Sequence, residues 1–328
     1  MSTNPKIALS VVILTPDRYD RIRKTIEHLR RQTARDCMEV VIAAPSLREL
    51  QPDHTELSDF AAVRLVEVGP IQSTGEPRAT ATRAATGPVI AYAEDHCWPE
   101  PNWAAALIEA HRESWAGVGA TLMNANAGSV LSWAALLLNF GPSVDRHASG
   151  ACDYIPTHNS SYKADLLHSY GEQLGFLLAA EGLLQADLIR QGHQLFLQAK
   201  ARAAHINTSA FSAFLREQYW GTRVFWASRV EREKWSVIRR GGWAVATPGL
   251  IPVRFQRALR NALRIGFPAR RMPALVGAVA AGAISLTFGA VCGILGGLGR
   301  KSVERRISLE FHRCRHLPPE ERGLLPND

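Results

Sequence analysis

The sequence predicts an α/β protein with a doubly wound sheet, followed by a C-terminal helical region that is associated with a membrane. Short apolar runs rich in β-branched residues alternate with segments of helical periodicity between residues 7 and 110, which is the pattern of a parallel sheet covered by helices. Residues 201–328 hold 21 Lys or Arg against 8 Asp or Glu, so this part favours an anionic partner. Residues 272–299 contain no charged side chain, which favours a membrane helix.

The predicted elements follow in order along the chain. The predicted strands are 7–15, 39–43, 63–68, 88–93 and a short one at 194–198. The predicted helices are one containing Ile22, Ile26 and Leu29, one at 77–86 that stops at Gly87, one containing Trp103, Leu107 and Ile108, one at 181–191 and one at 253–266. Continuous apolar runs favour buried strands, whereas apolar residues three and four apart favour helices. Asp17 is expected to cap the helix that follows the first strand.

Composition excludes several classes of protein. Apolar residues make up 46% of the 328 residues and charged residues 21%, which rules out a disordered, collagenous or disulfide-scaffold chain. The five cysteines are odd in number and none forms a CxxC pair, which fits a reducing compartment and disfavours a zinc ribbon. The apolar run from Ile7 to Leu14 has no small-residue cleavage site, so we expect a strand there and not a signal peptide.

The charge-free segment carries the membrane prediction. Its 28 residues are long enough as a helix to cross a hydrocarbon core of ~30 Å. Basic pairs flank it at 270–271 and 300–301, so the distribution of positive charge gives no orientation. Gly289, Gly293 and Gly297 recur every four residues, a spacing typical of close helix contacts in membranes. The alternative is a buried helical hairpin in a soluble domain.

The residues before this segment have a basic, aromatic character. Four Trp lie among many Arg in 211–243, and 253–266 alternates apolar residues with arginines. A basic amphipathic helix of this kind suits a membrane surface, and the alternative is an ordinary solvated basic face. No helix-turn-helix, zinc finger or RNP-like motif accompanies the positive charge, so nucleic acid is not an expected partner.

Polar side chains follow the fourth predicted strand directly. Glu94, Asp95 and His96 stand at its end, and ligands of a doubly wound sheet bind at the carboxyl ends of its strands. Two carboxylates and an imidazole can bind a divalent cation that holds a diphosphate, with Mn²⁺ or Mg²⁺ as the candidates. The alternative is that the acidic pair only caps the next helix.

Two stretches together resemble glycosyltransferase family 2, whose members are inverting enzymes of the GT-A fold. The first runs from SVVILTPDR to PRATATRAATGPVIAYAEDHCWPEPNWAAAL, in which Arg78 precedes Glu94 by sixteen residues and Thr86-Gly87 matches the Thr-Gly before strand four. Glu94 and His96 occupy the outer positions of the acidic DxD motif. The second, AEGLLQADLIRQGHQLFLQAKARAAH at 180–205, resembles the helix with the catalytic base and its closing His. The resemblance covers residues 1–205.

The resemblance implies a role for each matching residue. It implies that Glu181 is the base that takes a proton from the acceptor hydroxyl, and that Arg78 pairs with the diphosphate. It implies donor binding by Thr15, Asp17, Arg78, Glu94 and Asp95, metal binding by Glu94, Asp95, His96 and His205, and sugar or acceptor contacts by Trp98, His158 and Asn159. Each role has an ordinary alternative: Glu181 as an exposed helix carboxylate, His205 as a structural histidine, the Trp as core, and Ser160 or Ser161 as a helix cap.

Some positions depart from the family pattern. Strand two ends in Ala44 and Pro45, where the family carries an acidic pair that reads the nucleobase, so the nucleotide is not assigned. Ala180 stands where the family commonly has Glu. These changes, with Glu and His in the DxD motif, admit a catalytically decayed relative that binds sugar nucleotides or acts as a scaffold. A sugar nucleotidyltransferase is disfavoured, because no glycine-rich loop follows strand one.

The sequence therefore predicts a membrane-associated inverting glycosyltransferase. Its expected parts are a GT-A catalytic domain at 1–207, a basic amphipathic segment at 208–271, a membrane helix or hairpin at 272–299 and a basic tail at 300–328. The expected partners are a nucleotide-sugar donor, a glycan or lipid-linked acceptor such as polyprenyl phosphate, and membrane lipids. The expected location is the inner or plasma membrane, with the catalytic domain on the cytoplasmic side and a role in polysaccharide biosynthesis.

Overall fold

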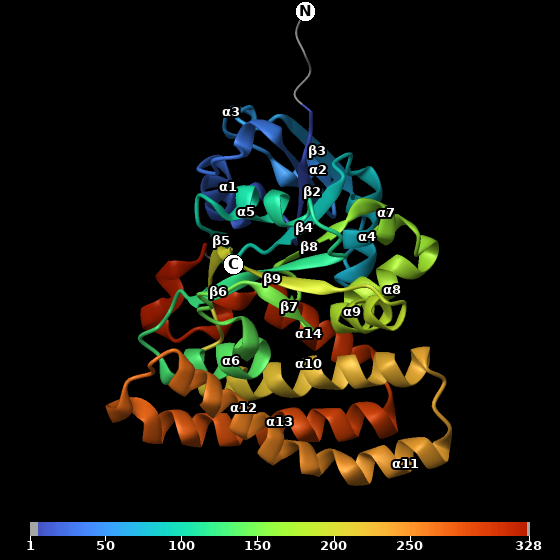
Figure 1. Cartoon of the computed structure of the whole chain (residues 1–328), viewed down its shortest axis with the longest axis vertical. Coiled ribbons are helices and arrows are strands. Elements are labelled where there is room, and N and C mark those ends of the chain that lie inside the picture. Colours follow the sequence, from blue (N-terminus) through green and yellow to red (C-terminus); the bar gives the residue numbers. More distant parts are fainter. Residues whose placement is uncertain (1–5, 327–328) are drawn as a thin grey trace, which may run out of the picture. The chain divides into compact units, whose positions relative to one another are not determined.

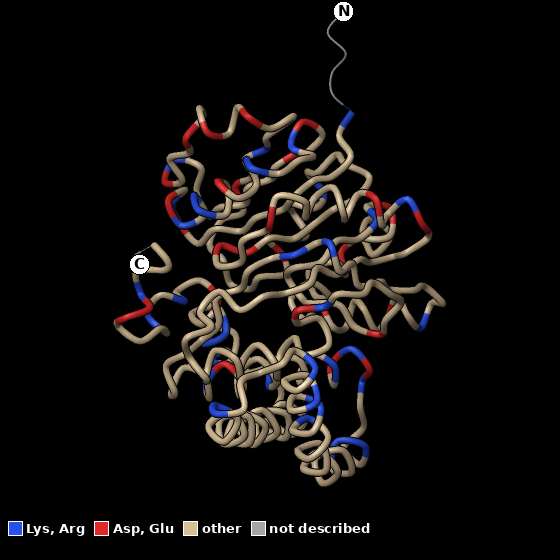
Figure 2. The backbone as a smooth tube through the Cα atoms, turned by 60° about the vertical axis from the view of Figure 1, so that its left-hand side comes forward, with Lys and Arg blue, Asp and Glu red and all other residues tan. Residues whose placement is uncertain are grey.

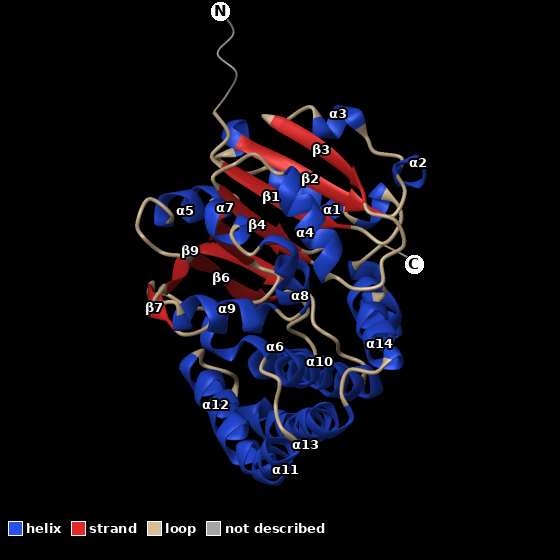
Figure 3. Cartoon of the chain, turned by 90° about the vertical axis from the view of Figure 1, so that its right-hand side faces the viewer, coloured by secondary structure: helices blue, strands red, loops and turns tan. Residues whose placement is uncertain are grey.

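The computed structural model describes residues 6–326, which divide into two compact units (Figure 1). Unit 1 comprises residues 6–123 and 145–205, and unit 2 comprises residues 124–144 and 206–326. Unit 1 holds the sheet and unit 2 is built from helices (Figure 3).

The bounds of the elements are as follows. The strands are Leu9–Leu14 (β1), Met38–Ala44 (β2), Ala62–Glu67 (β3), Val89–Ala93 (β4), Cys97–Pro99 (β5), Gly117–Asn124 (β6), Gly150–Cys152 (β7), Ser160–Lys163 (β8) and Leu195–His205 (β9). The helices of unit 1 are Arg23–Arg30 (α1), Leu47–Leu50 (α2), His54–Leu57 (α3), Gly75–Ala84 (α4), Trp103–Ala110 (α5), Ala164–His168 (α7), Leu174–Ala179 (α8) and Glu181–Arg190 (α9). The helices of unit 2 are Val130–Phe140 (α6), Phe211–Arg232 (α10), Val237–Ala246 (α11), Leu250–Arg264 (α12), Met272–Gly296 (α13) and Arg300–Phe311 (α14).

The sheet of unit 1 combines a parallel half with an antiparallel half. Its strand order is β3-β2-β1-β4-β8-β6-β9-β5, with β7 also paired to β9. The first four strands are parallel, and β8 is antiparallel to both β4 and β6. Strands β5 and β7 run antiparallel to β9. In Figure 1, α1 and α5 lie on one side of the strands and α4, α7, α8 and α9 on the other.

A buried carboxylate ties the amino ends of the parallel strands together. Glu39 on β2 is fully buried and accepts hydrogen bonds from Ser10 Oγ, from the backbone N–H and hydroxyl of Thr86 at 2.7 and 3.0 Å, and from Arg64 Nε at 2.6 Å. A Cβ on Gly87 would lie 2.7 Å from Ser10 Oγ, so only glycine fits there. The Thr-Gly pair before β4 is thus held at the edge opposite the carboxyl ends of the strands.

Two glycines explain why β6 has a weak strand pattern. A Cβ on Gly117 would lie 2.8 Å from the ring of Tyr162 on β8, and one on Gly119 would lie 2.5 Å from Ile155. Glycine lowers strand propensity, and it is used inside strands where a neighbour approaches closely. The close packing of β6 therefore requires glycines, and these glycines weaken the strand pattern in the sequence.

Unit 2 is organised around α13. Side chains of α6, α10, α12 and α13 form one buried cluster that includes Phe214, Phe267 and Val279. A second cluster joins α10, the residues before α11, and α13 through Trp226, Trp235 and Ile294. Between residues 234 and 299 the chain has nine basic and no acidic residues. In Figure 2, Lys and Arg (blue) are more common than Asp and Glu (red) in the helical unit.

The predicted fold class is confirmed: an α/β sheet is followed by a helical C-terminal region. Among the described residues, one apolar helix, Ala269–Gly296, is long enough to cross a membrane. The expected short strand at 194–198 is the start of the longer β9. The segment 124–144, which the sequence placed inside the catalytic domain, belongs to unit 2.

Two predicted helix caps are wrong. The expected cap Asp17 instead accepts a hydrogen bond from its neighbour Arg18 and pairs with Arg21 at 3.3 Å, because a short 3₁₀ turn at Tyr19–Arg21 precedes α1. The alternative in which Ser160 or Ser161 caps the following helix is also wrong, because both lie inside β8.

Candidate active site

The site lies at the carboxyl ends of the central parallel strands. Glu94 is the first residue after β4, and Thr15 is the first after β1. Ile13 and Ala93 are partners in the register of these two strands, so Thr15 and Glu94 emerge at the same edge of the sheet. Thr15 Oγ1 donates to the carbonyl of Arg18 at 3.1 Å, which fixes the turn after β1.

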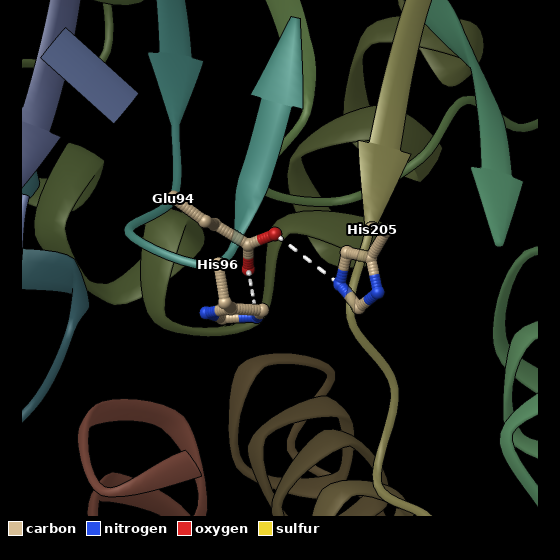
Figure 4. Close-up of side chains that lie close together, drawn as sticks. All are labelled: Glu94, His96 and His205. Carbon is tan, nitrogen blue, oxygen red and sulfur yellow. Dashed lines mark ion pairs between the residues drawn. The ribbon is translucent and has the colours of Figure 1, made fainter. Parts of the chain in front are cut away.

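Glu94, His96 and His205 form a cluster that can hold a metal ion (Figure 4). One candidate ligand atom from each lies within 4.8 Å of the other two. The Glu94 carboxylate is 3.7 Å from His96 Nε2 and 3.5 Å from His205 Nε2. All three side chains are buried. Pairing of β5 with β9 sets this arrangement, because Cys97 is the register partner of His205.

Asp95 acts behind His96 instead of joining the cluster. Its Oδ1 lies 2.6 Å from His96 Nδ1, and a carboxylate can only accept. His96 therefore donates from Nδ1 to Asp95, which leaves Nε2 as the ring nitrogen that faces the cluster. Among the described residues, His96 Nε2 is a buried nitrogen with no hydrogen-bond partner. A ring oriented by a carboxylate with the other nitrogen open is the usual state of a metal-binding histidine, so the cluster fits a divalent ion.

The electrostatics of the cluster favour an ionised carboxylate. Burial by itself raises the pKa of Glu94, but His96 and His205 outweigh burial and hold this pKa well below its ordinary value. Asn159 Nδ2 donates to Glu94 Oε2 at 2.6 Å and supports the same charge. The cluster therefore presents one negative charge and two imidazole nitrogens, a mixture of hard and intermediate ligands that suits Mn²⁺ better than Mg²⁺.

Glu181 lies at the centre of a second buried group. It is the first residue of α9 and is 2% exposed. Its carboxylate accepts hydrogen bonds from the backbone N–H of His158 at 2.6 Å, from Ser160 Oγ at 2.5 Å and from Tyr162 OH at 2.7 Å. Arg78 on α4 contacts Nδ1 of the His158 ring, the same nitrogen that lies 3.3 Å from Glu181 Oε2. Five of the predicted site residues are thus joined by contacts: Arg78 meets His158, His158 meets Glu181, and Asn159 meets Glu94.

The pKa values of this group keep its charges in place. Burial alone raises the pKa of Glu181, but hydrogen bonding to His158 and its charge lower this pKa below the ordinary value. Burial, reinforced by the Glu181 carboxylate, raises the pKa of Tyr162 well above its usual range. Tyr162 therefore remains a protonated donor beside an ionised carboxylate at neutral pH.

The sequence profile described as Glycosyl transferase family 2 matches residues 10–171. The chain belongs to glycosyl transferase family 2. The match includes Arg78, Glu94, His96 and His158, and it ends before Glu181 and His205, which the fold of this glycosyltransferase brings to the same residues.

Solved glycosyltransferase structures are similar at low identity. The crystal structure of S. aureus TarS 1-349 is 14% identical with a TM-score of 0.46, covering 87% of this chain and 91% of that one. The crystal structure of GalNAc-T7 with UDP, GalNAc and Mn²⁺ is 12% identical with a TM-score of 0.45, covering 61% of this chain and 43% of that one. No curated protein sequence matches this glycosyltransferase.

Two predicted site residues of the glycosyltransferase lie away from these clusters. The Trp98 side chain is 8% exposed, with Lys24 Nζ 3.6 Å from its ring centre and the His28 ring stacked on it at 6.0 Å. Trp98 is therefore a core residue that packs against α1, which is the alternative given above for this side chain. Asp17 lies on the turn after β1 with its carboxylate paired to Arg21.

Sequence reasoning missed three residues that complete the site. Ser160 and Tyr162 both donate to Glu181, and the hydroxyl of Thr25 donates to the backbone carbonyl of Glu94 at 2.9 Å. Ser160 and Tyr162 alternate along β8, so they point to the same face of the strand. The alternation was visible in the sequence, but the short strand carrying it was not.

Proposed function

We propose that this glycosyltransferase moves a sugar from a nucleotide-sugar donor to an acceptor hydroxyl with inversion at the anomeric carbon. The arrangement of Glu94, His96 and His205 at the carboxyl ends of the strands carries the proposal, because it places a divalent-ion site where a doubly wound sheet binds its ligand. When bound there, Mn²⁺ would stabilise the charge that develops on the departing nucleoside diphosphate.

Arg78 supplies the fixed positive charge of the proposed donor site. Its guanidinium lies in a buried position on α4, where a charge-assisted bond to a diphosphate is stronger than in water. His158 stands between Arg78 and Glu181, and Asn159 follows it directly. We propose that these two residues face the sugar, since they join the diphosphate side of the site to the proposed base.

Glu181 is the proposed base. Its lowered pKa keeps it ionised, and it stands beside the residues of the proposed sugar site. Its oxygens already accept three hydrogen bonds and the carboxylate is buried, so we propose that an acceptor hydroxyl takes the place of one donor. Ser160 Oγ is the donor that rotation about a single side-chain bond can remove, whereas Tyr162 is fixed in the core and His158 donates from the backbone.

Activity of two variants tests this assignment. Glu181→Gln is expected to lower kcat by at least about a hundredfold, because it removes the general base. Ser160→Ala is expected to retain activity, because the acceptor hydroxyl takes over its bond to Glu181. Transfer is measured with purified enzyme, a panel of UDP-, GDP- and dTDP-sugars, and Mn²⁺. Full activity of Glu181→Gln in a folded protein would remove Glu181 from this role.

A binding measurement separates the enzyme from a decayed relative. Thermal shifts with the same nucleotide sugars, with and without Mn²⁺, report donor binding without turnover. A metal-dependent shift together with transfer supports the proposal. A shift without transfer to any acceptor would instead leave a protein that binds sugar nucleotides.

We propose that the acceptor is a lipid-linked glycan or a polyprenyl phosphate, and that the enzyme works at the inner or plasma membrane with its site on the cytoplasmic side. The acid-free basic stretch at 234–299 and the long apolar helix α13 support membrane association. No disulfide joins any two of the five cysteines, all of which the structure describes, and this is consistent with a reducing compartment. A role in polysaccharide biosynthesis would follow from such an acceptor.

A further inference from the structure

Helix α13 is held against α10 by direct contact with its backbone. A Cβ on Gly289 would lie 2.2 Å from the carbonyl oxygen of Tyr219, and one on Gly293 would lie 2.4 Å from that of Arg223. Ser285 Oγ donates to the carbonyl of Leu215 at 2.8 Å. These contacts advance in the same direction along both helices, so α10 and α13 run parallel with no side chains between them over several turns. The regularly spaced glycines of the charge-free segment therefore mediate the contact between α13 and α10 within unit 2.

The partner helix cannot enter hydrocarbon with α13. Its 22 residues include Arg216, Glu217, Arg223, Arg229, Glu231 and Arg232. Glu217 is buried and pairs with Arg313 at 3.1 Å. A charged side chain at the centre of a bilayer is costly, and removing α10 from α13 would expose the glycine face. The helix with the length of a membrane span is thus fixed to a charged neighbour.

The opposite face of α13 is uncovered and apolar. Ile284, Phe288 and Leu295 are 58%, 62% and 56% exposed. At about 100° per residue, these three positions share one side of the helix, and Gly289 and Gly293 lie on the other. One face of α13 is therefore joined to α10, while the other meets solvent with large apolar side chains.

Helix α11 exposes apolar side chains more fully. Val237, Ile238 and Val245 are 83%, 88% and 83% exposed, and α11 itself contacts α13 within unit 2. Apolar groups exposed to this extent on neighbouring helices mark a surface that another body covers. Residues 234–299 contain nine basic residues and no acidic one. This charge fits a uniformly anionic surface, because a protein partner of mixed charge would be complemented by both acidic and basic residues.

We infer that unit 2 docks in the plane of an anionic lipid bilayer, with the exposed side chains of α11 and α13 inserted into one leaflet and no helix crossing it. The inference rests on the proposed action at a membrane and specifies its partner and its depth. The exposed apolar side chains supply the buried area, and the exposed Arg257 and Arg260 of α12 bind the headgroups. Helix α13 is then the platform on which α11 and α12 rest.

Vesicle flotation of the full-length enzyme tests the surface without requiring turnover. Binding to vesicles of equal phosphatidylcholine and phosphatidylglycerol is expected to exceed binding to phosphatidylcholine alone by about tenfold or more at low salt. The combined variant Val237→Glu, Ile238→Glu and Val245→Glu is expected to lose this binding. Ile189→Glu is the matched control, because Ile189 is an exposed apolar residue of unit 1.

A second pair of variants covers the case in which the triple variant misfolds. Arg257→Gln with Arg260→Gln changes only exposed residues of α12 and is expected to weaken binding to the anionic vesicles but not to neutral ones. If wild type and the variants float equally well with the vesicles, this surface does not bind the membrane and the inference fails. A lipid-free dimer that the triple variant abolishes would assign the surface to a second copy of the chain instead.

Thiol labelling distinguishes docking in the plane from crossing. Cysteines introduced singly as Arg270→Cys and Lys301→Cys stand just beyond the two ends of α13. After binding to sealed vesicles, an impermeant maleimide is expected to label both extra thiols without detergent. If one of them reacts only after detergent, α13 crosses the bilayer and the inference fails, while the proposed glycosyl transfer stands untouched.

Discussion

His205 Nε2 lies 3.5 Å from Glu94 Oε2, although Glu94 follows the fourth strand and His205 ends the last. The short strand β5 makes this proximity possible. It starts three residues after Glu94 and pairs Cys97 with His205. Two candidate ligands near each other in the sequence, Glu94 and His96, thereby meet a third, His205, from the far end of unit 1.

Loss of the central carboxylate is expected to weaken metal binding. Glu94→Gln replaces the one ionised ligand by a neutral amide, so Mn²⁺ affinity measured by titration calorimetry should fall by about a hundredfold. Glu109→Gln changes an exposed carboxylate on α5 and should leave the affinity unchanged. Equal affinity of all three proteins would place the metal elsewhere.

Asp95→Ala is expected to have a milder effect than Glu94→Gln. Asp95 orients His96 through Nδ1, so its removal frees the imidazole to rotate but leaves every ligand atom in the chain. A loss of about tenfold in Mn²⁺ affinity is expected. Electron paramagnetic resonance of bound Mn²⁺ would report the change. An effect as large as that of Glu94→Gln would show that Asp95 is itself a ligand.

The contact between α10 and α13 gives a matched pair of glycine substitutions. Gly293→Ala forces a Cβ against the carbonyl of Arg223 and should lower the free energy of unfolding by about 3 kcal/mol. Gly277→Ala lies on the exposed part of the same helix with no atom within 4 Å, and should raise it by about 1 kcal/mol. Chemical denaturation followed by circular dichroism measures both. If the two variants behave alike, the close contact is absent in solution.

Stability of unit 1 is expected to fall below neutral pH because of His111. Burial lowers the pKa of this side chain from 6.5 to about 4, and its Nε2 lies 2.9 Å from Ser161 Oγ. Between those two values the unfolded chain binds a proton that the folded chain does not, so the free energy of unfolding decreases as the pH falls.

The contribution of His111 to the free energy of unfolding is large enough to measure. A shift of this size corresponds to a loss of about 2 kcal/mol between pH 7.5 and pH 5. His111→Gln keeps a polar group near Ser161 but cannot titrate in this range, so its stability should depend less on pH. Urea unfolding at the two pH values compares the variant with wild type. Identical pH dependence in both would show that other groups set it.

The sequence predicted the parallel half of the sheet more completely than the antiparallel half. Strands β1, β2 and β4 are mostly apolar, with Ser10 and Glu39 as polar exceptions in β1 and β2, and such apolar runs are detectable in the sequence. Strand β8 has four residues and two serines, and β6 carries glycines for close packing, so only tertiary contacts define them. The residues of the candidate site that could be predicted were likewise those recognisable from local sequence.

The candidate site was predictable where its functional residues are neighbours in the sequence or follow the spacing of the family. Glu94 and His96 are neighbours, and His205 followed from the family spacing. That Asp95 faces His96 and that Glu181 is enclosed by Ser160 and Tyr162 depend on side-chain directions set by β5 and β8, which a pattern of residue types does not contain.

The link between Glu39 and Thr86 affects how variants of this enzyme should be interpreted. Thr86 belongs to the Thr-Gly pair that matches the family pattern, yet its hydroxyl donates to the Glu39 carboxylate at the amino ends of the strands. Replacing it would reduce how much enzyme a cell accumulates, while each surviving molecule would turn over at the normal rate. A screen that records only product per culture would count Thr86 among the catalytic residues, and normalising to enzyme abundance would remove it from that group.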